Sequence, residues 1–156
     1  MVELDPRLHF VVATAIIHRE GKYLIAKRAP HEKAYPNVWT VPGGKLVLSE
    51  YKNNPKTTND AWYGLVNWLL AKEVKEEVGL EIDVPHYLTD LAFVRPDGYP
   101  VITLSYWCNY KSGEVALCKD LTDHAWVSLE EAKKFDLIEG IWDELKMVDE
   151  VLKRRN

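Results

Sequence analysis

The chain has 156 residues, of which 47% are hydrophobic and 28% are charged, and its formal net charge is −4 at pH 7. These values indicate one soluble globular domain, which we expect to span residues 1–156. An acidic chain without a basic stripe argues against a nucleic-acid partner. No apolar run is long enough to span a bilayer, and the two isolated cysteines, Cys108 and Cys118, are typical of a reducing compartment. We therefore expect a cytoplasmic protein with no membrane partner.

The first half of the chain predicts strands followed by one long helix. Residues 10–17 and 23–27 are rich in β-branched and apolar residues and predict two strands, joined by a turn at residues 20–22. Residues 38–41 follow, and Pro42-Gly43-Gly44 predicts a break in regular structure. The polar residues 51–59 predict a surface loop. A helix should begin near Ala61 and end at about Val78, with Gly79 as its C-terminal cap.

The second half predicts a hairpin, a short strand and helices. Residues 87–94 and 99–110 read as strands around a Pro96-Asp97-Gly98 turn. Residues 125–127 predict a last strand, and Ser128 with Glu131 has the spacing of a capping box that starts a helix at Leu129. Residues 139–155 predict an amphipathic C-terminal helix. The order of these elements predicts a mixed β-sheet sandwiched between α-helices, an α+β or α/β fold.

The predicted helix over residues 61–78 carries three glutamates in an unusual place. At about 3.6 residues per turn, Trp62, Leu65, Val66 and Leu69 form one apolar stripe. Glu73, Glu76 and Glu77 continue that stripe, whereas Lys72 and Lys75 fall on its flank and on the far side. A run of Lys and Glu is usually a solvated helix face, but a solvated face would place the glutamates opposite the apolar stripe.

Three carboxylates on the inward side of a helix repel one another and resist desolvation. Magnesium ions, which prefer oxygen ligands, would compensate for both effects. The spacing i, i+3 and i+4 puts all three acids within reach of one metal cluster. The sequence therefore predicts a site for Mg²⁺, with Mn²⁺ as a substitute.

Together these segments resemble the Nudix box of the Nudix hydrolases, including the MutT-like members. Gly44 is followed after five residues by Glu50, and Lys72-Glu73-Val74-Lys75-Glu76-Glu77-Val78-Gly79-Leu80 matches the second half of the box. Trp39-Thr40-Val41-Pro42-Gly43-Gly44 before the box also resembles the family. The resemblance covers most of the chain.

The resemblance has two departures. Residues 51–71, here called the spacer, stand where the family has seven residues, so that 14 are extra, and residues 51–60 form an inserted loop. The spacer leaves the role of Glu50 open. Lys72 stands where the family has an arginine that orients the first glutamate. Lysine keeps the charge but loses the planar fork of the guanidinium, so we expect an altered rather than an abolished activity.

The resemblance implies that Mg²⁺ binds to Glu73, Glu76 and Glu77, with help from a backbone carbonyl at Gly43 or Gly44. Glu73, Glu76 and Lys72 are the catalytic candidates, and Glu73 is also a candidate base. An acid outside the box often joins the site in this family. Asp120 has the matching position, while Asp123 and Glu114 remain alternatives. Candidates for substrate binding are Trp39, Arg28, Gly43 and Lys45; Lys27 could also reach phosphates.

The implied activity is Mg²⁺-dependent hydrolysis of the diphosphate linkage in a nucleoside diphosphate-X, such as a nucleoside triphosphate, by attack of water at phosphorus. ADP-ribose or a nucleotide sugar is the alternative substrate. A catalytically silent nucleotide-binding or regulatory module of the same fold is an alternative of another class, and an isoprenoid diphosphate isomerase ranks below both. The partner is then a small nucleotide, and the family makes a homodimer plausible.

Overall fold

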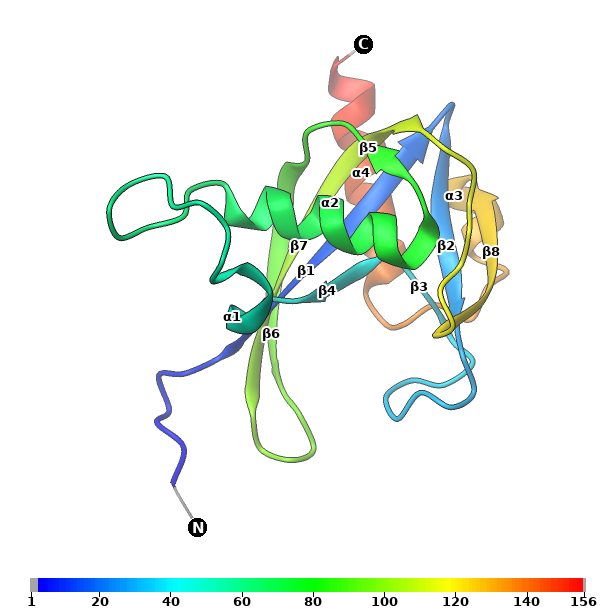
Figure 1. Ribbon diagram of the computed structural model, residues 1–156. Coiled ribbons are helices and arrows are strands. Elements are labelled where there is room, and N and C mark those ends of the chain that lie inside the picture. Colours follow the sequence, from blue (N-terminus) through cyan, green and yellow to red (C-terminus); the bar gives the residue numbers. More distant parts are fainter. Residues whose placement is uncertain (1–2, 156) are drawn as a thin grey trace.

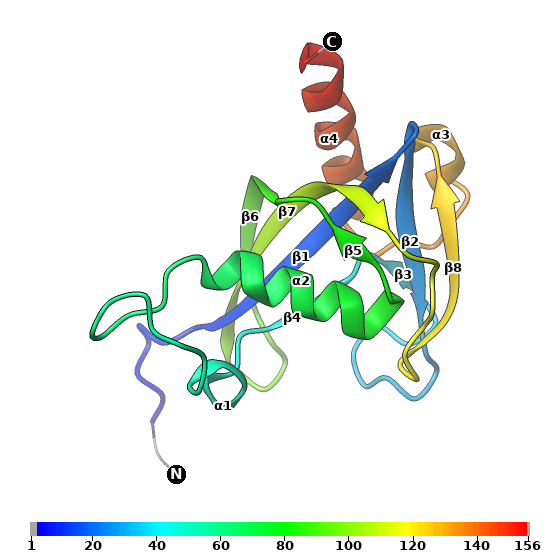
Figure 2. The same cartoon turned by 45° about the horizontal axis from the view of Figure 1, so that its top comes forward.

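The computed structural model describes residues 3–155, which form a mixed β-sheet with helices on both faces (Figures 1 and 2). The strands are β1 Phe10–Arg19, β2 Lys22–Arg28, β3 Trp39–Thr40, β4 Gly43–Lys45, β5 Glu81–Ile82, β6 His86–Val94, β7 Pro100–Ser112 and β8 Leu121–Val127. The helices are α1 Leu48–Tyr51, α2 Leu65–Val78, α3 Leu129–Ala132 and α4 Ile141–Arg155.

Strand β1 lies at the centre of the sheet. It runs parallel to β7 from the Phe10–Val101 pair to the His18–Asn109 pair, and it is antiparallel to β2 and β4. The path of the sheet is β3-β2-β1-β7-β5, with β4 on β1, β6 on β7 and β8 on β2. Because β1 and β7 are parallel while their other neighbours are antiparallel, the predicted mixed sheet is confirmed.

Each face of the sheet is covered by a helical layer that closes a hydrophobic core. Successive strand residues point to opposite faces, so Ala13, Ala15 and Ile17 of β1 pack against α2, while Ile16 packs against the α4 side. Helix α2 contributes Leu69, Leu70, Val74 and Val78 to the first core. Helix α4 contributes Ile141, Leu145 and Val148 to the second. The predicted sandwich of a mixed sheet between helices is confirmed.

Most predicted elements are found, with corrections at their ends. The hairpin of β6 and β7 is confirmed, and so is the capping box, in which the Ser128 side chain accepts from the Glu131 N–H at 3.1 Å. The predicted break at Pro42-Gly43-Gly44 is found at residues 41–42, between β3 and β4, but its extension over the glycines is wrong. Gly43 and Gly44 form β4, because β1 offers a free edge to which their backbone hydrogen-bonds. The short elements α1 and β5 were not predicted, and β8 begins four residues earlier than expected.

The long helix begins later than predicted. Helix α2 starts at Leu65 after Gly64, whose φ of 70° is the left-handed conformation that glycine adopts most readily. Trp62 therefore lies before the helix, and its indole N–H donates to the Asn54 carbonyl at 2.8 Å. The helix ends where expected: Gly79 has a φ of 75°, and its N–H donates to the Lys75 carbonyl at 3.1 Å. Glu73, Glu76 and Glu77 lie in its regular last turns.

Within residues 3–155, none of the helices has the length and the apolar character needed to cross a bilayer.

Candidate functional site

The three glutamates of α2 differ in how far they are buried. The buried side of the helix runs through Leu70, Val74 and Val78, and Glu73 and Glu77 flank it. The Glu73 side chain is only 14% exposed, whereas the Glu76 side chain, at the rim, is 57% exposed. The projected apolar stripe of Trp62, Leu65, Val66 and Leu69 is therefore rotated in the structure, which leaves Glu76 nearer to solvent.

Glu73 lies directly against the backbone of Gly44 in β4. A Cβ atom added at Gly44 would come closer to the Glu73 carboxyl group than real Cβ contacts allow. Glycine at this position therefore provides the space in which the carboxylate lies. Helix α2 crosses β4 at this point (Figure 2). Strand β4, which the sequence did not predict, therefore sets the position of Glu73.

Lys72 joins the acids of α2 to Glu50 of α1. Its Nζ lies 2.8 Å from Glu50 Oε2, 3.3 Å from Glu73 Oε1 and 3.2 Å from Glu76 Oε2. Burial by itself lowers the pKa of Lys72, but the bonds to Glu50, Glu76 and Glu73 outweigh it and hold the pKa above its usual value. The sequence left the role of Glu50 open; the structure brings it to the cluster even though 21 residues of spacer intervene.

Glu77 is the acid of α2 that ionises least readily. Burial, followed by repulsion from Glu73, raises the pKa of its carboxyl group to about 8, although a backbone hydrogen bond from Gly43 and the charge of Arg28 oppose the shift. Burial also raises the pKa of Glu73, against the opposing effect of Lys72. Two half-buried carboxyl groups with raised pKa values need further positive charge to be ionised together.

A cavity of about 260 Å³ lies beside these acids. Glu73, Glu76 and Glu77 line it on the side of α2, and Arg28, Glu32, Cys118, Asp120 and Leu121 line the opposite side. Arg28 is at the end of β2, and Asp120 directly precedes β8. The pairing of β2 with β8 thus brings Arg28 and Asp120, two of the predicted site residues, to face the glutamates.

Glu32, in this cavity wall, and His31, which contacts Asp120 beside it, have no counterpart among the sequence predictions. His31 Nε2 lies 2.9 Å from Asp120 Oδ1, and Glu32 Oε2 lies 3.0 Å from an Nη atom of Arg28. The hydrogen bond with His31 is the main cause that lowers the pKa of Asp120. His31 and Asp120 are 89 positions apart in the chain, and no local pattern links them, so the sequence held no signal for this pair.

Other predicted residues lie elsewhere. The Trp39 ring packs edge-on against Phe135, with 4.8 Å between ring centroids, in the second core on the α4 side. The role of Trp39 as a stacking platform is therefore not supported, because its ring faces away from α2. Lys45, on β4, has its ammonium group 6.0 Å from the centre of the Phe10 ring and does not line the cavity. Lys27 and Asp123 are paired across β2 and β8.

The residues around the cavity fit a divalent metal ion by their chemistry. Carboxylate oxygens are the ligands that Mg²⁺ prefers, and α2 presents three of them beside Asp120. The pKa values of Glu73 and Glu77 are raised, so both acids resist ionisation. A cation would supply positive charge that favours their ionised forms. Lys72, with one charge shared among three carboxylates, offsets only part of the repulsion.

Comparison with known proteins agrees with this architecture. A protein named nucleoside triphosphatase NudI, from Klebsiella pneumoniae strain 342, is 26% identical over 136 residues, which are 81% of this chain and 86% of that protein. The MutT protein from Methanosarcina mazei Go1 superimposes with a TM-score of 0.71 at 24% identity, over 96% of this chain and 99% of that chain. The chain is thus similar in sequence to a nucleoside triphosphatase and in fold to a MutT protein of the Nudix hydrolases.

The Nudix fold is shared by proteins of very different sequence. The Nudix domain of Shewanella oneidensis NrtR, solved in complex with ADP ribose, superimposes with a TM-score of 0.70 at only 14% identity, over 96% of this chain and 94% of that chain. No protein-family model matches the chain. In this chain, β4, α1, the loop of residues 52–64 and α2 together carry the acidic cluster.

Proposed function

We propose that this Nudix protein is a Mg²⁺-dependent hydrolase that cleaves the diphosphate linkage of a nucleoside diphosphate-X. The observation that carries the proposal is the convergence of Glu73, Glu76 and Glu77 on one cavity, opposite Arg28 and Asp120. Because the relatives are named nucleoside triphosphatases, a nucleoside triphosphate is the first candidate substrate. ADP-ribose and nucleotide sugars are the alternatives, since the site fixes the bond type and not the attached group.

Glu73, Glu76 and Glu77 would hold the metal, together with Asp120 and the backbone carbonyl of Gly44; Mn²⁺ would substitute for Mg²⁺. When bound, the metal supplies positive charge for the phosphate oxygens and makes a bound water more acidic. Lys72 acts as a positioning residue, because its ammonium group fixes the directions of Glu73 and Glu76.

In the proposed reaction, the oxygen of a water molecule forms a bond to phosphorus while the bridging P–O bond breaks. The electron pair of that bond leaves with the second phosphate fragment, and Glu73 accepts a proton from the water. Arg28 lines the same cavity, and bonds to Glu32 and to the Ala34 carbonyl hold its guanidinium in place. Its remaining N–H groups can donate to substrate phosphate.

The composition and the cysteines of the chain bear on its partner and its compartment. A net charge of −4 without a basic stripe favours a small nucleotide over a nucleic acid. We take residues 1–156 as one domain and a homodimer as its assembly. Cys108 and Cys118 are free thiols, which accords with the reducing cytoplasm expected for this protein.

The test is a substrate panel with Mg²⁺: canonical and oxidised nucleoside triphosphates, ADP-ribose, nucleotide sugars and dinucleoside polyphosphates, with phosphate and pyrophosphate products measured separately. We expect turnover of at least one class, its loss in EDTA and its recovery with added Mg²⁺. Lack of turnover across the whole panel would favour a catalytically silent nucleotide-binding module and overturn the proposal.

Glu76→Gln is the variant that tests the metal site. Because it removes one charged ligand, we expect kcat/KM to fall at least about 100-fold, with the melting temperature little changed. Glu130→Gln is the matched control: Glu130 is an exposed acid on α3, across the sheet from the cavity. Equal activity of Glu76→Gln and the wild type would refute the metal role of Glu76.

A further inference from the structure

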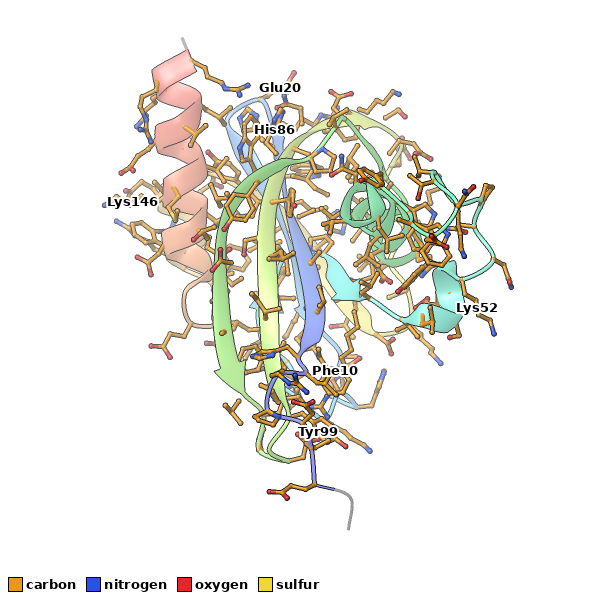
Figure 3. The ribbon with its side chains drawn as sticks, turned by 90° about the vertical axis from the view of Figure 1, so that its left-hand side faces the viewer. Phe10, Glu20, Lys52, His86, Tyr99 and Lys146 are labelled. Atoms are coloured by element: carbon orange, nitrogen blue, oxygen red, sulfur yellow. The ribbon has the colours of Figure 1, made fainter. Side chains whose placement is uncertain are left out.

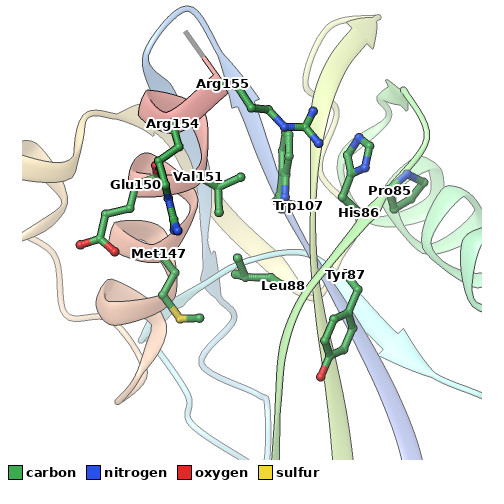
Figure 4. A pocket seen from close by; sticks show the side chains of 10 residues that line it. All are labelled: Pro85, His86, Tyr87, Leu88, Trp107, Met147, Glu150, Val151, Arg154 and Arg155. Atoms are coloured by element: carbon green, nitrogen blue, oxygen red, sulfur yellow. The ribbon is translucent and has the colours of Figure 1, made fainter.

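Two cavities in the described part of the chain differ in the charge of their walls. The cavity of about 640 Å³ beside α4 is lined by the carboxylate of Glu150 and by the guanidinium groups of Arg154 and Arg155 (Figure 4). The cavity of about 260 Å³ beside α2 is lined by one guanidinium group and five carboxylates: Arg28, Glu32, Glu73, Glu76, Glu77 and Asp120. The cavity beside α2 is therefore the one that attracts cations.

The charges around the cavity beside α2 do not balance. With the ammonium group of Lys72, which contacts Glu73 and Glu76, two positive groups face five acids, an excess of three negative charges when all are ionised. One divalent cation at the acids of α2 leaves one negative charge in excess, and a bound diphosphate adds more. Part of the excess lies on the wall opposite α2, where Glu32 and Asp120 are. A second cation on that wall balances the charge.

The wall opposite α2 offers donor atoms for such a cation. His31, Glu32 and Asp120 each contribute one donor atom, and the three atoms lie within 4.8 Å of one another. His31 Nε2 and Asp120 Oδ1 are 2.9 Å apart. Ligand atoms around a tetrahedral Zn²⁺ lie about 3.4 Å from one another, since the metal–ligand bonds are about 2.1 Å long. Because the three side chains are partly exposed, small rotations bring the donor atoms to that distance.

Both carboxylates keep an oxygen for a metal. Asp120 uses Oδ1 towards His31, and Glu32 uses Oε2 towards Arg28. Among residues 3–155, neither Asp120 Oδ2 nor Glu32 Oε1 accepts a hydrogen bond. A metal can therefore bind to Glu32 through Oε1 while the ion pair with Arg28 stays intact.

The backbone holds the donors close together before a metal binds. The Ala29 N–H donates to the Asp120 carbonyl at 2.9 Å, and the Glu32 N–H donates to the Ala29 carbonyl at 3.2 Å. The first bond joins the end of β2 to the residue before β8, and the second closes the turn that carries His31. The two segments that supply the donors are thus tied to each other through Ala29, as a preformed site requires.

We propose that His31, Glu32 and Asp120 form a second metal site, which binds a divalent transition-metal ion such as Zn²⁺ in preference to Mg²⁺. An imidazole nitrogen suits Zn²⁺ and Co²⁺, whereas Mg²⁺ takes oxygen ligands. Three protein ligands leave a coordination position for water or for a phosphate oxygen. Asp120 has two carboxylate oxygens and can serve both this site and the acids of α2. A role of the second metal in hydrolysis rests on the proposed function, but its binding does not.

Calorimetry on the full chain, with Mg²⁺ in excess to occupy the acids of α2, tests the site. We expect one Zn²⁺ to bind per chain, and Co²⁺ to bind more tightly than Mn²⁺. His31→Ala and Glu32→Gln should each raise the Kd for Zn²⁺ at least about tenfold. A wild-type chain that binds no Zn²⁺ in excess Mg²⁺, or variants that bind Zn²⁺ as the wild type does, would overturn the proposal.

His86→Ala is the matched control for the loss of an imidazole. Figure 3 shows His86 on β6, which pairs with β7, whereas Asp120 precedes β8 on the β2 side of the sheet. We expect unchanged Zn²⁺ binding in His86→Ala, in Glu76→Gln and in Cys118→Ser, although the Cys118 thiol lines the same cavity. Loss of Zn²⁺ binding in Glu76→Gln or Cys118→Ser, with normal binding in His31→Ala, would assign the ion to the acids of α2 or to the thiol and refute the site.

Nitrogen NMR of the histidine rings shows which imidazole binds the metal. We expect Zn²⁺ to shift the Nε2 resonance of His31 and to leave that of His86 in place; the reverse result would overturn the proposal. The shift does not depend on hydrolysis. A chain that shows it but turns over no substrate would support the second site and refute the proposed hydrolase. A chain that hydrolyses substrate with Mg²⁺ but shows no shift would refute the second site alone.

Discussion

Lys72 shows how a single side chain can change the geometry of a site while keeping its charge. Its ammonium group contacts Glu50, Glu73 and Glu76 at once. The guanidinium of an arginine would offer a planar fork to one carboxylate at a time. A flexible ammonium group at the centre of three acids instead acts as a point charge, so the direction of Glu73 depends also on the backbone of Gly44.

We predict that Lys72→Ala lowers kcat/KM between about 10- and 100-fold, because the loss of a positioning residue leaves the three acids free to repel one another. Lys72→Arg should keep most of the activity. The stability of Lys72→Ala should fall by about 1 kcal/mol without metal, since the pairs are partly exposed, and added Mg²⁺ should recover it. Steady-state kinetics measure the change in kcat/KM, and thermal melts with and without Mg²⁺ measure the change in stability. A Lys72→Ala protein with normal kcat/KM would contradict the positioning role.

Replacement by alanine should have different effects at Gly43 and at Gly44, the two adjacent glycines of β4. In Gly44→Ala the new methyl group would displace the Glu73 carboxyl group, so we predict a loss of activity of about 100-fold with little loss of stability. In Gly43→Ala the methyl group would meet the Ala13 carbonyl of β1, which cannot move without breaking the pairing of β1 and β4. We therefore expect Gly43→Ala to cost about 1–3 kcal/mol of folding stability. Denaturant titrations of both variants distinguish the two effects, and equal losses of stability would be evidence against this assignment.

At the scale of elements, the part of the spacer between α1 and α2, residues 52–64, is a loop ordered by its own contacts. Thr58 Oγ1 accepts from the N–H of Asp60 and of Ala61, and the Thr57 side chain accepts from the Tyr63 N–H at 3.0 Å. The Trp62 ring packs edge-on against Tyr51 of α1, with 5.2 Å between centroids. Figure 1 shows the loop extending beyond α1 and returning to the start of α2. These contacts hold α1 near α2, which keeps Glu50 beside Lys72.

We predict that Trp62→Ala loosens the spacer without unfolding the sheet. The variant loses the hydrogen bond to Asn54 and the contact with Tyr51, each of which contributes about 1 kcal/mol. Amide exchange in residues 52–64 should quicken at least about tenfold, because local opening becomes easier. Tyr63→Ala is the matched control, since Tyr63 is mostly exposed. Unchanged exchange in Trp62→Ala would show that other contacts hold the loop.

At the scale of the whole molecule, the two cores are not equally apolar. The second core contains Ser105 and the carboxyl group of Glu144, whose Oε1 atom is buried and has no hydrogen-bond partner within the described residues. Burial raises the pKa of Glu144, while a hydrogen bond with Ser105 opposes the shift. A carboxylate buried in this way lowers the stability of the sandwich when it is ionised.

We predict that Glu144→Gln stabilises the protein by about 1 kcal/mol at pH 7. The pKa of Glu144 is higher in the folded state than in the unfolded chain, so its stabilising contribution is present at low pH and is lost as the pH rises through the folded pKa. The difference between variant and wild type should therefore vanish below about pH 4, where the carboxyl group is protonated in both states. Denaturant titrations between about pH 4 and pH 7 measure the stability difference between Glu144→Gln and the wild type. Glu150→Gln is the control, because Glu150 is an exposed acid on the same helix. A stability difference independent of pH would exclude ionisation of Glu144 as the cause.

The sequence by itself determined the features that depend on neighbours along the chain. The cap at Gly79, the capping box at Ser128, the hairpin turn at Pro96-Asp97-Gly98 and the helical spacing of the α2 acids all follow from local hydrogen bonding and periodicity. The same local reasoning failed at Gly43-Gly44, because glycine favours turns in isolation but forms a strand where β1 supplies the partner.

Only the tertiary structure decided which distant residues meet. The contacts of Lys72 with Glu50 and of His31 with Asp120 span 22 and 89 positions, and they depend on how the strands and α2 are packed. The same packing turned Trp39 to the opposite core. Sequence periodicity gives the face on which a residue lies, but the pairing order of the strands decides what that face meets.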